Sequence, residues 1–218
     1  TAGQLLARFW DVESGSISIG GKDIRDYSTK ALMNTVAFVF QDTYIFAESV
    51  YDNIAMHQNV TQEAVEYAAK AARCHDFIQA LPEGYHTKLG DGGHKLSGGE
   101  AQRIAIARAI LKYAPIVVLD EAMAFTDAEN ELALREGMAE LLKGKTVLMI
   151  AHRLYSIQDA DMIFVLENGR LKESGTHKDL LQKHGLYAHL WDIQNETESW
   201  RMKGGAVYVS DNPAIHLP

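Results

Sequence analysis

The chain has 218 residues, of which 47% are hydrophobic and 23% are charged. This composition excludes disordered and collagen-like chains and fits one domain of ordinary size with room for a subdomain. Lys and Arg number 21 against 29 Asp and Glu, so the formal net charge is −8. That charge disfavours a general binder of the nucleic-acid backbone, and we expect no nucleic-acid partner.

The single cysteine, Cys74, allows no internal disulfide and fits a reducing, cytosolic setting. The longest apolar runs, such as residues 116–119 and 147–151, are far shorter than the ~20 residues of a membrane helix. No secretory signal opens the sequence. These short runs lead us to expect a soluble chain. Because Thr1 has no Met before it, we also expect the chain to be a piece of a longer polypeptide.

The first 41 residues predict the beginning of an α/β core. Residues 16–19 alternate polar and apolar side chains, as a half-buried strand does, and residues 29–33 predict a helix. Residues 36–40 form a continuous apolar run that is typical of a strand buried on both faces. This strand ends at Gln41.

The next 72 positions, residues 42–113, predict an all-helical region. Residues 48–56 and 61–81 each predict one helix, the second with a Thr N-cap. A glycine-rich stretch, residues 89–99, then leads into an Ala- and Ile-rich helix over residues 100–112.

Strands are predicted again over residues 115–120, 146–150 and 162–166, separated by helical segments. Asp127 is the expected N-cap of the helix between the first two, and Gly144 ends it. This alternation predicts a mainly parallel sheet flanked by helices.

The predicted organisation is an α/β core with a helical insert. Residues 1–41 and 114–197 form the core, residues 42–113 form the all-helical subdomain, and residues 198–218 form an unassigned tail.

Two acids follow the apolar run of residues 116–119. In an open α/β sheet, ligands bind beyond the carboxyl ends of the strands, so Asp120 and Glu121 would face that edge. Asp120 could hold Mg²⁺ and Glu121 could take a proton from an attacking water. The alternative is a strand that ends in a solvated acidic turn.

Gln41 and His152 follow two other predicted strands. Alone, each is more often structural than catalytic. Together with Asp120 and Glu121 they make four polar residues that we expect at one sheet edge.

Ser97, Gly98 and Gly99 open the helix over residues 100–112 and would expose backbone N–H groups to an anion. In the alternative interpretation, Ser97 is an N-cap and the glycines only make a turn. That alternative leaves unexplained two glycines in a first turn, where each costs ~1 kcal/mol of helix propensity.

These motifs resemble those of the nucleotide-binding domain of ABC (ATP-binding cassette) transporters. Leu96, Ser97, Gly98, Gly99 and Glu100, followed by Gln102 and Arg103, resemble the signature sequence LSGGQ. Residues 116–121 resemble the Walker B strand with its catalytic glutamate, and Gln41 and His152 fall at the Q-loop and the switch histidine. The motifs keep the family's order, and the similarity covers about residues 1–190.

The resemblance implies a P-loop NTPase (RecA-like) core with ATP and Mg²⁺ as ligands. Glu121 would polarise the attacking water, Asp120 and Gln41 would address Mg²⁺, and His152 would orient the γ-phosphate. The signature would serve the nucleotide of a second cassette, identical or different, and Asp127 in the D-loop would link the two sites.

Two segments resemble those of exporter-type cassettes, and we call them the exporter segments. Residues 87–93 are similar to the TxVGExG stretch that such cassettes place against their membrane domain, and residues 47–54 (AESVYDNI) are similar to the stretch after the Q-loop. The resemblance implies a transmembrane domain fused upstream and a location at the cytoplasmic face of a membrane.

Three departures from the family pattern stand out. The sequence holds no phosphate-binding loop of the form GxxxxGKS/T, and Thr1 is expected just after that loop's magnesium-binding hydroxyl. We therefore expect the isolated 218 residues to be inactive. Glu100 replaces the usual signature glutamine, with modest expected effect, and residues 124–127 (AFTD) replace SALD.

Two alternative functions stay open at this point. One is a cassette ATPase that acts on nucleic acid or ribosomes, which the charge of −8 disfavours. The other is a truncated, non-hydrolysing partner subunit, which the acids at 120 and 121 disfavour.

The run Cys74, His75, Asp76 is no catalytic trio, because neighbours on a helix point in different directions.

Overall fold

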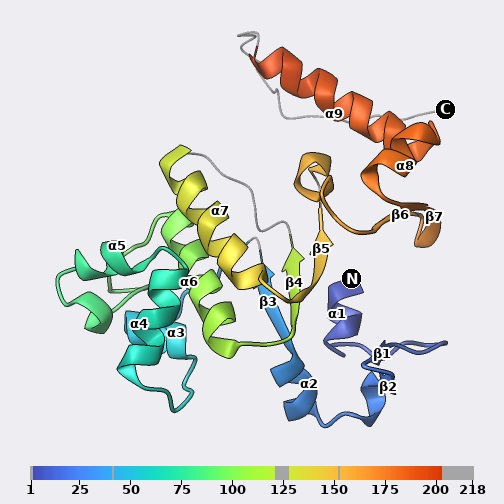
Figure 1. Cartoon of the computed structure of the whole chain (residues 1–218). Coiled ribbons are helices and arrows are strands. Elements are labelled where there is room, and N and C mark those ends of the chain that lie inside the picture. The colour runs from blue at the N-terminus through green and yellow to red at the C-terminus, as the bar shows by residue number, and fades with distance from the viewer. Residues whose placement is uncertain (1, 41, 121–127, 152, 203–218) are drawn as a thin grey trace. The chain divides into compact units, whose positions relative to one another are not determined.

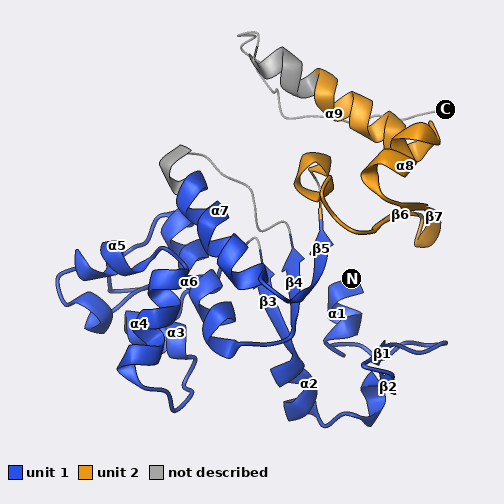
Figure 2. Cartoon of the chain, in the orientation of Figure 1, with its two compact units in different colours: residues 1–150 blue, residues 151–218 orange. Residues whose placement is uncertain are grey.

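The computed structural model describes residues 2–40, 42–120, 128–151 and 153–202, the last six of these and residues 128–130 by backbone alone. The chain divides into two compact units, residues 1–150 and residues 151–218 (Figure 2). Each unit is described by itself. The predicted boundaries of core, helical insert and tail stay a prediction.

The first unit is built on a parallel three-stranded sheet. Strands β3 (Val36–Phe40), β4 (Ile116–Asp120) and β5 (Thr146–Ile150) lie in the order β3-β4-β5 (Figure 1). Both pairings are parallel. The α/β fold class and the parallel sheet predicted from the apolar runs are therefore confirmed.

The two faces of the sheet bury different side chains because successive residues of a strand point to opposite sides. Ala37, Val39, Val117 and Leu119 join the main hydrophobic core. On the other face, helix α1 (Ala2–Leu6) approaches the sheet through Gly3, where an added Cβ would come within 2.9 Å of a methyl group of Val118.

Helices form most of the rest of the first unit (Figure 1). They are α2 (Thr29–Thr35), α3 (Val50–Ala55), α4 (Gln62–Ala71), α5 (His75–Gln79), α6 (Gly98–Lys112) and α7 (Ala128–Leu142), with 3-10 turns η1 (Ile24–Asp26) and η2 (Gly84–His86). A small antiparallel pair, β1 (Ser18–Ile19) and β2 (Lys22–Asp23), completes it. The described residues between β3 and α6 contribute isolated bridges but no strand of a sheet, as expected.

The single helix predicted over residues 61–81 is wrong. Thr61 does cap α4, but α4 ends before Arg73, whose φ of 56° is left-handed, and α5 follows. The backbone N–H of Cys74 donates to the carbonyl of Ala69, which closes the turn. This break lets the chain turn so that Cys74, at 0% exposure, enters the main core.

The second unit contains η3 (Leu154–Ile157), β6 (Ile163–Glu167), β7 (Arg170–Gly175), α8 (His177–Gln182) and α9 (Leu186–Met202). Its core comprises the buried side chains of Ile163, Val165, Leu180 and Tyr187. Helix α9 continues beyond residue 198, where the sequence pattern shows little periodicity. No helix in the described part of the chain is both long and apolar enough to cross a bilayer.

The strand predicted over residues 162–166 is β6, which pairs antiparallel with β7 within the second unit. Its predicted place in the parallel sheet stays a prediction. Asn168 and Gly169 connect the strands, both with positive φ (51° and 74°). Asn-Gly is the preferred pair for such a hairpin turn, which accounts for the pairing of β6 with β7.

Gly137 in α7 supplies a test of the close approach between α7 and the end of α4. An added Cβ would lie 3.0 Å from the carbonyl oxygen of Ala72 and 3.2 Å from its Cα, and these are backbone atoms. We expect Gly137→Ala to lower the free energy of unfolding by about 1–2 kcal/mol, because the overpacking outweighs the gain in helix propensity. Urea-induced unfolding followed by circular dichroism measures this.

The matched control is Gly98→Ala in α6, where an added Cβ would meet no atom within 4 Å. That variant should leave the free energy of unfolding unchanged or raise it. Equal effects of the two substitutions would contradict the packing described for Gly137.

Candidate functional site

The carboxyl ends of the three parallel strands meet at one edge of the sheet. Phe40 pairs with Asp120, and Asp120 pairs with Ile150, so the last residues of β3, β4 and β5 lie at one level. Gln41 and Glu121 come next in the chain, but both lie outside the described residues. Their predicted convergence gains support from the register and stays a prediction.

His152, two residues after β5, also lies outside the described residues, as do Thr1 and Asp127. Of the predicted magnesium ligands, the structure therefore describes Asp120 alone, half-buried at the end of β4. Its carboxylate oxygens suit Mg²⁺, which proteins usually hold through one or two carboxylates together with substrate phosphates. No group of three or more His, Cys, Asp or Glu side chains gathers into a metal site among the described residues.

The predicted signature turn, residues 96–100, begins helix α6. Ser97 is the N-cap: its Oγ accepts from the backbone N–H of Glu100 at 3.3 Å. In return, Glu100 Oε2 accepts from the backbone N–H of Ser97 at 2.8 Å. This reciprocal pair is a capping box, so the N-cap interpretation of Ser97 is confirmed.

Solvent reaches the same turn. Ser97 and Gly98 are exposed, and a Cβ added at Gly98 would face open space, whereas Leu96 packs against the core. The glycines thus leave the first turn of α6 uncovered by side chains. Such a turn can present N–H groups to an anion on another molecule.

Beyond this first turn, α6 is the central helix of the first unit. Ile104, Ile106 and Ala107 have no exposure, and Gln102 and Arg103 are 8% and 7% exposed. A helix buried on most sides cannot tilt without disturbing the core, so it holds the signature turn in a fixed direction.

The two exporter segments, about 40 residues apart in sequence, lie side by side. The N–H of Val50 donates to the carbonyl of Thr87 at 3.0 Å, and the N–H of Leu89 donates to the carbonyl of Glu48 at 2.8 Å. Gly90 fits against Ala47, where a Cβ would come within 3.3 Å of the Ala47 Cα. The two resemblances found separately in the sequence therefore mark one continuous hydrogen-bonded region.

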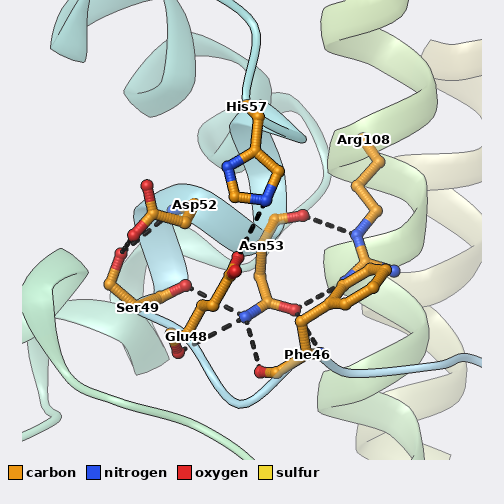
Figure 3. Close-up of polar contacts among 7 residues, drawn as sticks. All are labelled: Phe46, Glu48, Ser49, Asp52, Asn53, His57 and Arg108. Carbon is orange, nitrogen blue, oxygen red and sulfur yellow. Dashed lines mark hydrogen bonds and ion pairs between the residues drawn. The ribbon is translucent and has the colours of Figure 1, made fainter.

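A buried asparagine organises the first of these segments (Figure 3). Asn53 in α3 has no exposure, and its Oδ1 accepts from the N–H of Phe46 at 2.9 Å. Its Nδ2 donates to the carbonyls of Phe46 and Ser49, each at 3.0 Å. The side chain thereby supplies hydrogen bonds that the irregular backbone cannot make with itself.

Arg108 of α6 ties the same segment to the central helix (Figure 3). Its guanidinium donates to the carbonyl of Asn53 at 2.6 Å, to Asn53 Oδ1 at 2.7 Å and to the carbonyl of Tyr44 at 2.7 Å. Burial lowers the pKa of Arg108 to about 10. The sequence analysis missed both residues, and the available signal was an arginine within the otherwise apolar run of residues 104–111 in α6.

The run Cys74, His75, Asp76 is not a catalytic trio, in agreement with the sequence analysis. The Cys74 thiol is buried and donates to the carbonyl of Ala69 at 3.3 Å, whereas His75 Nδ1 lies 2.8 Å from the Tyr85 hydroxyl. Burial raises the pKa of Cys74 to about 12, which leaves a thiol rather than a nucleophilic thiolate.

Comparison with known proteins gives a family and relatives. The model of the family described as "ABC transporter" matches residues 1–124. A "Putative multidrug export ATP-binding/permease protein", YgaD of Bacillus subtilis (strain 168), is 48% identical over 192 residues, which are 88% of this chain and 33% of that protein. A protein with the same descriptive name from Staphylococcus aureus (strain NCTC 8325) is 47% identical over 192 residues, with the same coverage.

Among solved structures, a bacterial Atm1-family ABC exporter with ATP bound matches with a TM-score of 0.81 and 39% identity. The match covers 96% of this chain and 35% of that one. This chain thus spans about a third of the length of the curated relatives it matches. These similarities favour an exporter over a cassette that acts on nucleic acid or ribosomes.

Ser97 tests the capping box. We expect Ser97→Ala to lower the free energy of unfolding by about 1 kcal/mol, because the N–H of Glu100 loses its acceptor. Ser97→Asp keeps an acceptor at the N-cap and should stay close to the unsubstituted chain. Urea unfolding compares the three proteins, and equal stability of all three would mean that the cap contributes nothing.

The reactivity of the Cys74 thiol tests whether this residue is buried in the core beside α4. The folded chain should resist Ellman's reagent at pH 8, whereas the chain in urea should react fully, because folding holds the thiol protonated. Since the pKa rises from about 9 unfolded to about 12 folded, this thiol should reduce stability as the pH rises above about 9. Rapid labelling of the native chain would contradict the burial of Cys74.

Proposed function

Because the chain belongs to the ABC transporter family, we propose that it is the ATP-binding cassette of an exporter. In this proposal, two cassettes bind ATP between them in a head-to-tail arrangement. Hydrolysis of that ATP drives the export of a substrate across a membrane, with the cassette at the cytoplasmic face. The relatives are named for multidrug export and carry both ATP-binding and permease functions in their names.

The observation that carries the proposal is the level register of β3, β4 and β5. It supports a single edge at which the residues after Phe40, Asp120 and Ile150 meet one ligand. Sequence order then assigns Gln41, Glu121 and His152 to that edge.

Phosphoryl transfer needs placement and charge neutralisation more than covalent chemistry. Asp120 and Gln41 would hold Mg²⁺, which when bound neutralises charge on the phosphates. Glu121 polarises the attacking water and accepts its proton, and His152 orients the γ-phosphate. Asp127 connects the two sites of the pair.

The exposed signature turn supports the paired arrangement. Ser97 and Gly98 face solvent at the start of α6, and the Ser97 Oγ that accepts from Glu100 keeps a hydroxyl proton that it can donate to a nucleotide held by a second cassette. The carboxylate of Glu100 accepts a hydrogen bond from the N–H of Ser97 in the same chain. Leu96 and Gly99 complete the turn on either side.

The exporter segments supply the contact with the transmembrane domain. Tyr44 lies just before the first segment, is 71% exposed and packs edge to face on Phe46 with ring centroids 4.9 Å apart. An exposed aromatic pair beside the two segments is suited to receive a helix end from a membrane domain.

The experiment uses a chimaera of the Bacillus subtilis relative in which this chain replaces the matching 192 residues. Glu121→Gln should lower kcat for ATP hydrolysis by at least ~100-fold, because the amide cannot accept the proton of the water. Affinity for MgATP should change less than about threefold, because the substitution leaves unchanged the Mg²⁺ that neutralises the phosphates and the residues that hold it. Phosphate release and nucleotide binding measure the two quantities.

Glu131→Gln is the matched control. Glu131 forms a surface ion pair with Arg135 at 2.6 Å on α7, and its loss should leave kcat unaltered. Undiminished hydrolysis by the Glu121 variant would remove that residue from its assigned role. A chimaera that binds no ATP at all would refute the proposed function.

A further inference from the structure

Residues 44–48 belong to no helix or strand, and Ser49 only caps α3 and forms an isolated bridge with Lys88. Asn53 supplies further hydrogen bonds to this loop. Its buried amide makes two bonds to the backbone of Phe46 and one to the carbonyl of Ser49. A third contact of Nδ2, at 3.4 Å, reaches the carbonyl of Glu48. The amide oxygen also accepts from Arg108, so both ends of this side chain are satisfied.

Arg108 clamps this loop to α6 in a way that no other residue type reproduces. Its three acceptors are neutral oxygens of Tyr44 and Asn53, spread around the planar guanidinium, and the Phe46 ring lies 5.7 Å from its Cζ. A lysine carries the same charge but lacks the fork of N–H donors that holds several oxygens at once.

Asn53 and Arg108, which together we call the clamp, lie between the exporter segments and the signature turn of the proposed cassette. On one side, the carbonyl of Glu48 and the N–H of Val50 bond to the second exporter segment at Leu89 and Thr87. On the other, Arg108 sits on the same continuous helix as the signature turn, about 15 Å from Gly98 at 1.5 Å per residue. A hydrogen-bonded path therefore runs from the exporter segments to α6.

We propose that Asn53 and Arg108 are positioning residues that fix residues 44–49 to helix α6, so that the exporter segments and the signature turn shift as one body. This inference rests on the proposed function. Without the clamp, the loop would move independently of α6, and a nucleotide bound at the signature would no longer influence the exporter segments.

The first test uses the 218-residue chain and needs no substitution. If the clamp joins the loop to the helix, the amide of Phe46 and the amides of central α6 should open in one cooperative unit. Hydrogen exchange at increasing, sub-denaturing urea should then give both the same dependence on urea. Exchange at Phe46 that is fast and independent of urea, beside urea-dependent exchange in α6, would overturn the inference.

The second test compares variants of the same chain. Arg108→Lys should speed exchange of amides over residues 44–53 at least tenfold and leave exchange in α4 unaltered. Arg73→Lys is the matched control, because Arg73 forms an exposed ion pair with Glu136 at 2.9 Å, away from residues 44–53. Equal exchange over residues 44–53 in all three proteins would overturn the inference.

The third test measures coupling in the chimaera with MgATP and vanadate. In the unsubstituted chimaera, nucleotide should alter exchange both at residues 97–103 and at residues 87–93. In the Arg108→Lys variant, the change at 97–103 should persist while that at 87–93 falls at least threefold. A purely structural role for Arg108 would change both responses together, and that result would refute positioning.

The outcomes of the third test separate the two proposals. No response to nucleotide in either segment of the unsubstituted chimaera would count against the proposed function. A normal response in that protein, together with an equal response at residues 87–93 in the Arg108→Lys variant, would count against the clamp alone.

Discussion

The parallel, level pairing of β3, β4 and β5 is the constraint on which the rest of the first unit depends. It is satisfied only if both faces of the sheet are covered, since parallel strands bury both sides. The main core covers the face of Ala37 and Val117, and α1 approaches the face of Val118. Because the strands end at one level, their last residues, Phe40, Asp120 and Ile150, share one edge, and the convergence of the polar residues that follow them is our proposal.

Helix α6 fixes the signature turn and the loop after β3 relative to this sheet. Its apolar centre packs into the same core as β3 and β4, its first turn is closed by the Ser97–Glu100 capping box, and Arg108 extends from it to the irregular loop after β3. One buried helix thus fixes the direction of an exposed turn and the position of a loop. In the proposed exporter cassette, each of these places has a function.

Predictions from the sequence succeeded where a local pattern determines structure by itself. The apolar runs at residues 36–40 and 116–120 are the strands, and Ser97 and Thr61 cap helices as their types favour. They failed where a single backbone angle decided the outcome, because the left-handed Arg73 divided the helix predicted over residues 61–81. The hairpin of β6 and β7, closed by the Asn168–Gly169 turn, was not predicted.

The sequence alone determined the order and spacing of the motifs and with them the family, because each motif is a short stretch with its own chemistry. Only the tertiary structure decided which distant stretches touch. The two exporter segments meet through bonds such as Leu89 to Glu48, and Arg108 meets Asn53 across 55 positions. Such contacts depend on how helices pack around the core, and no periodicity along the chain encodes that packing.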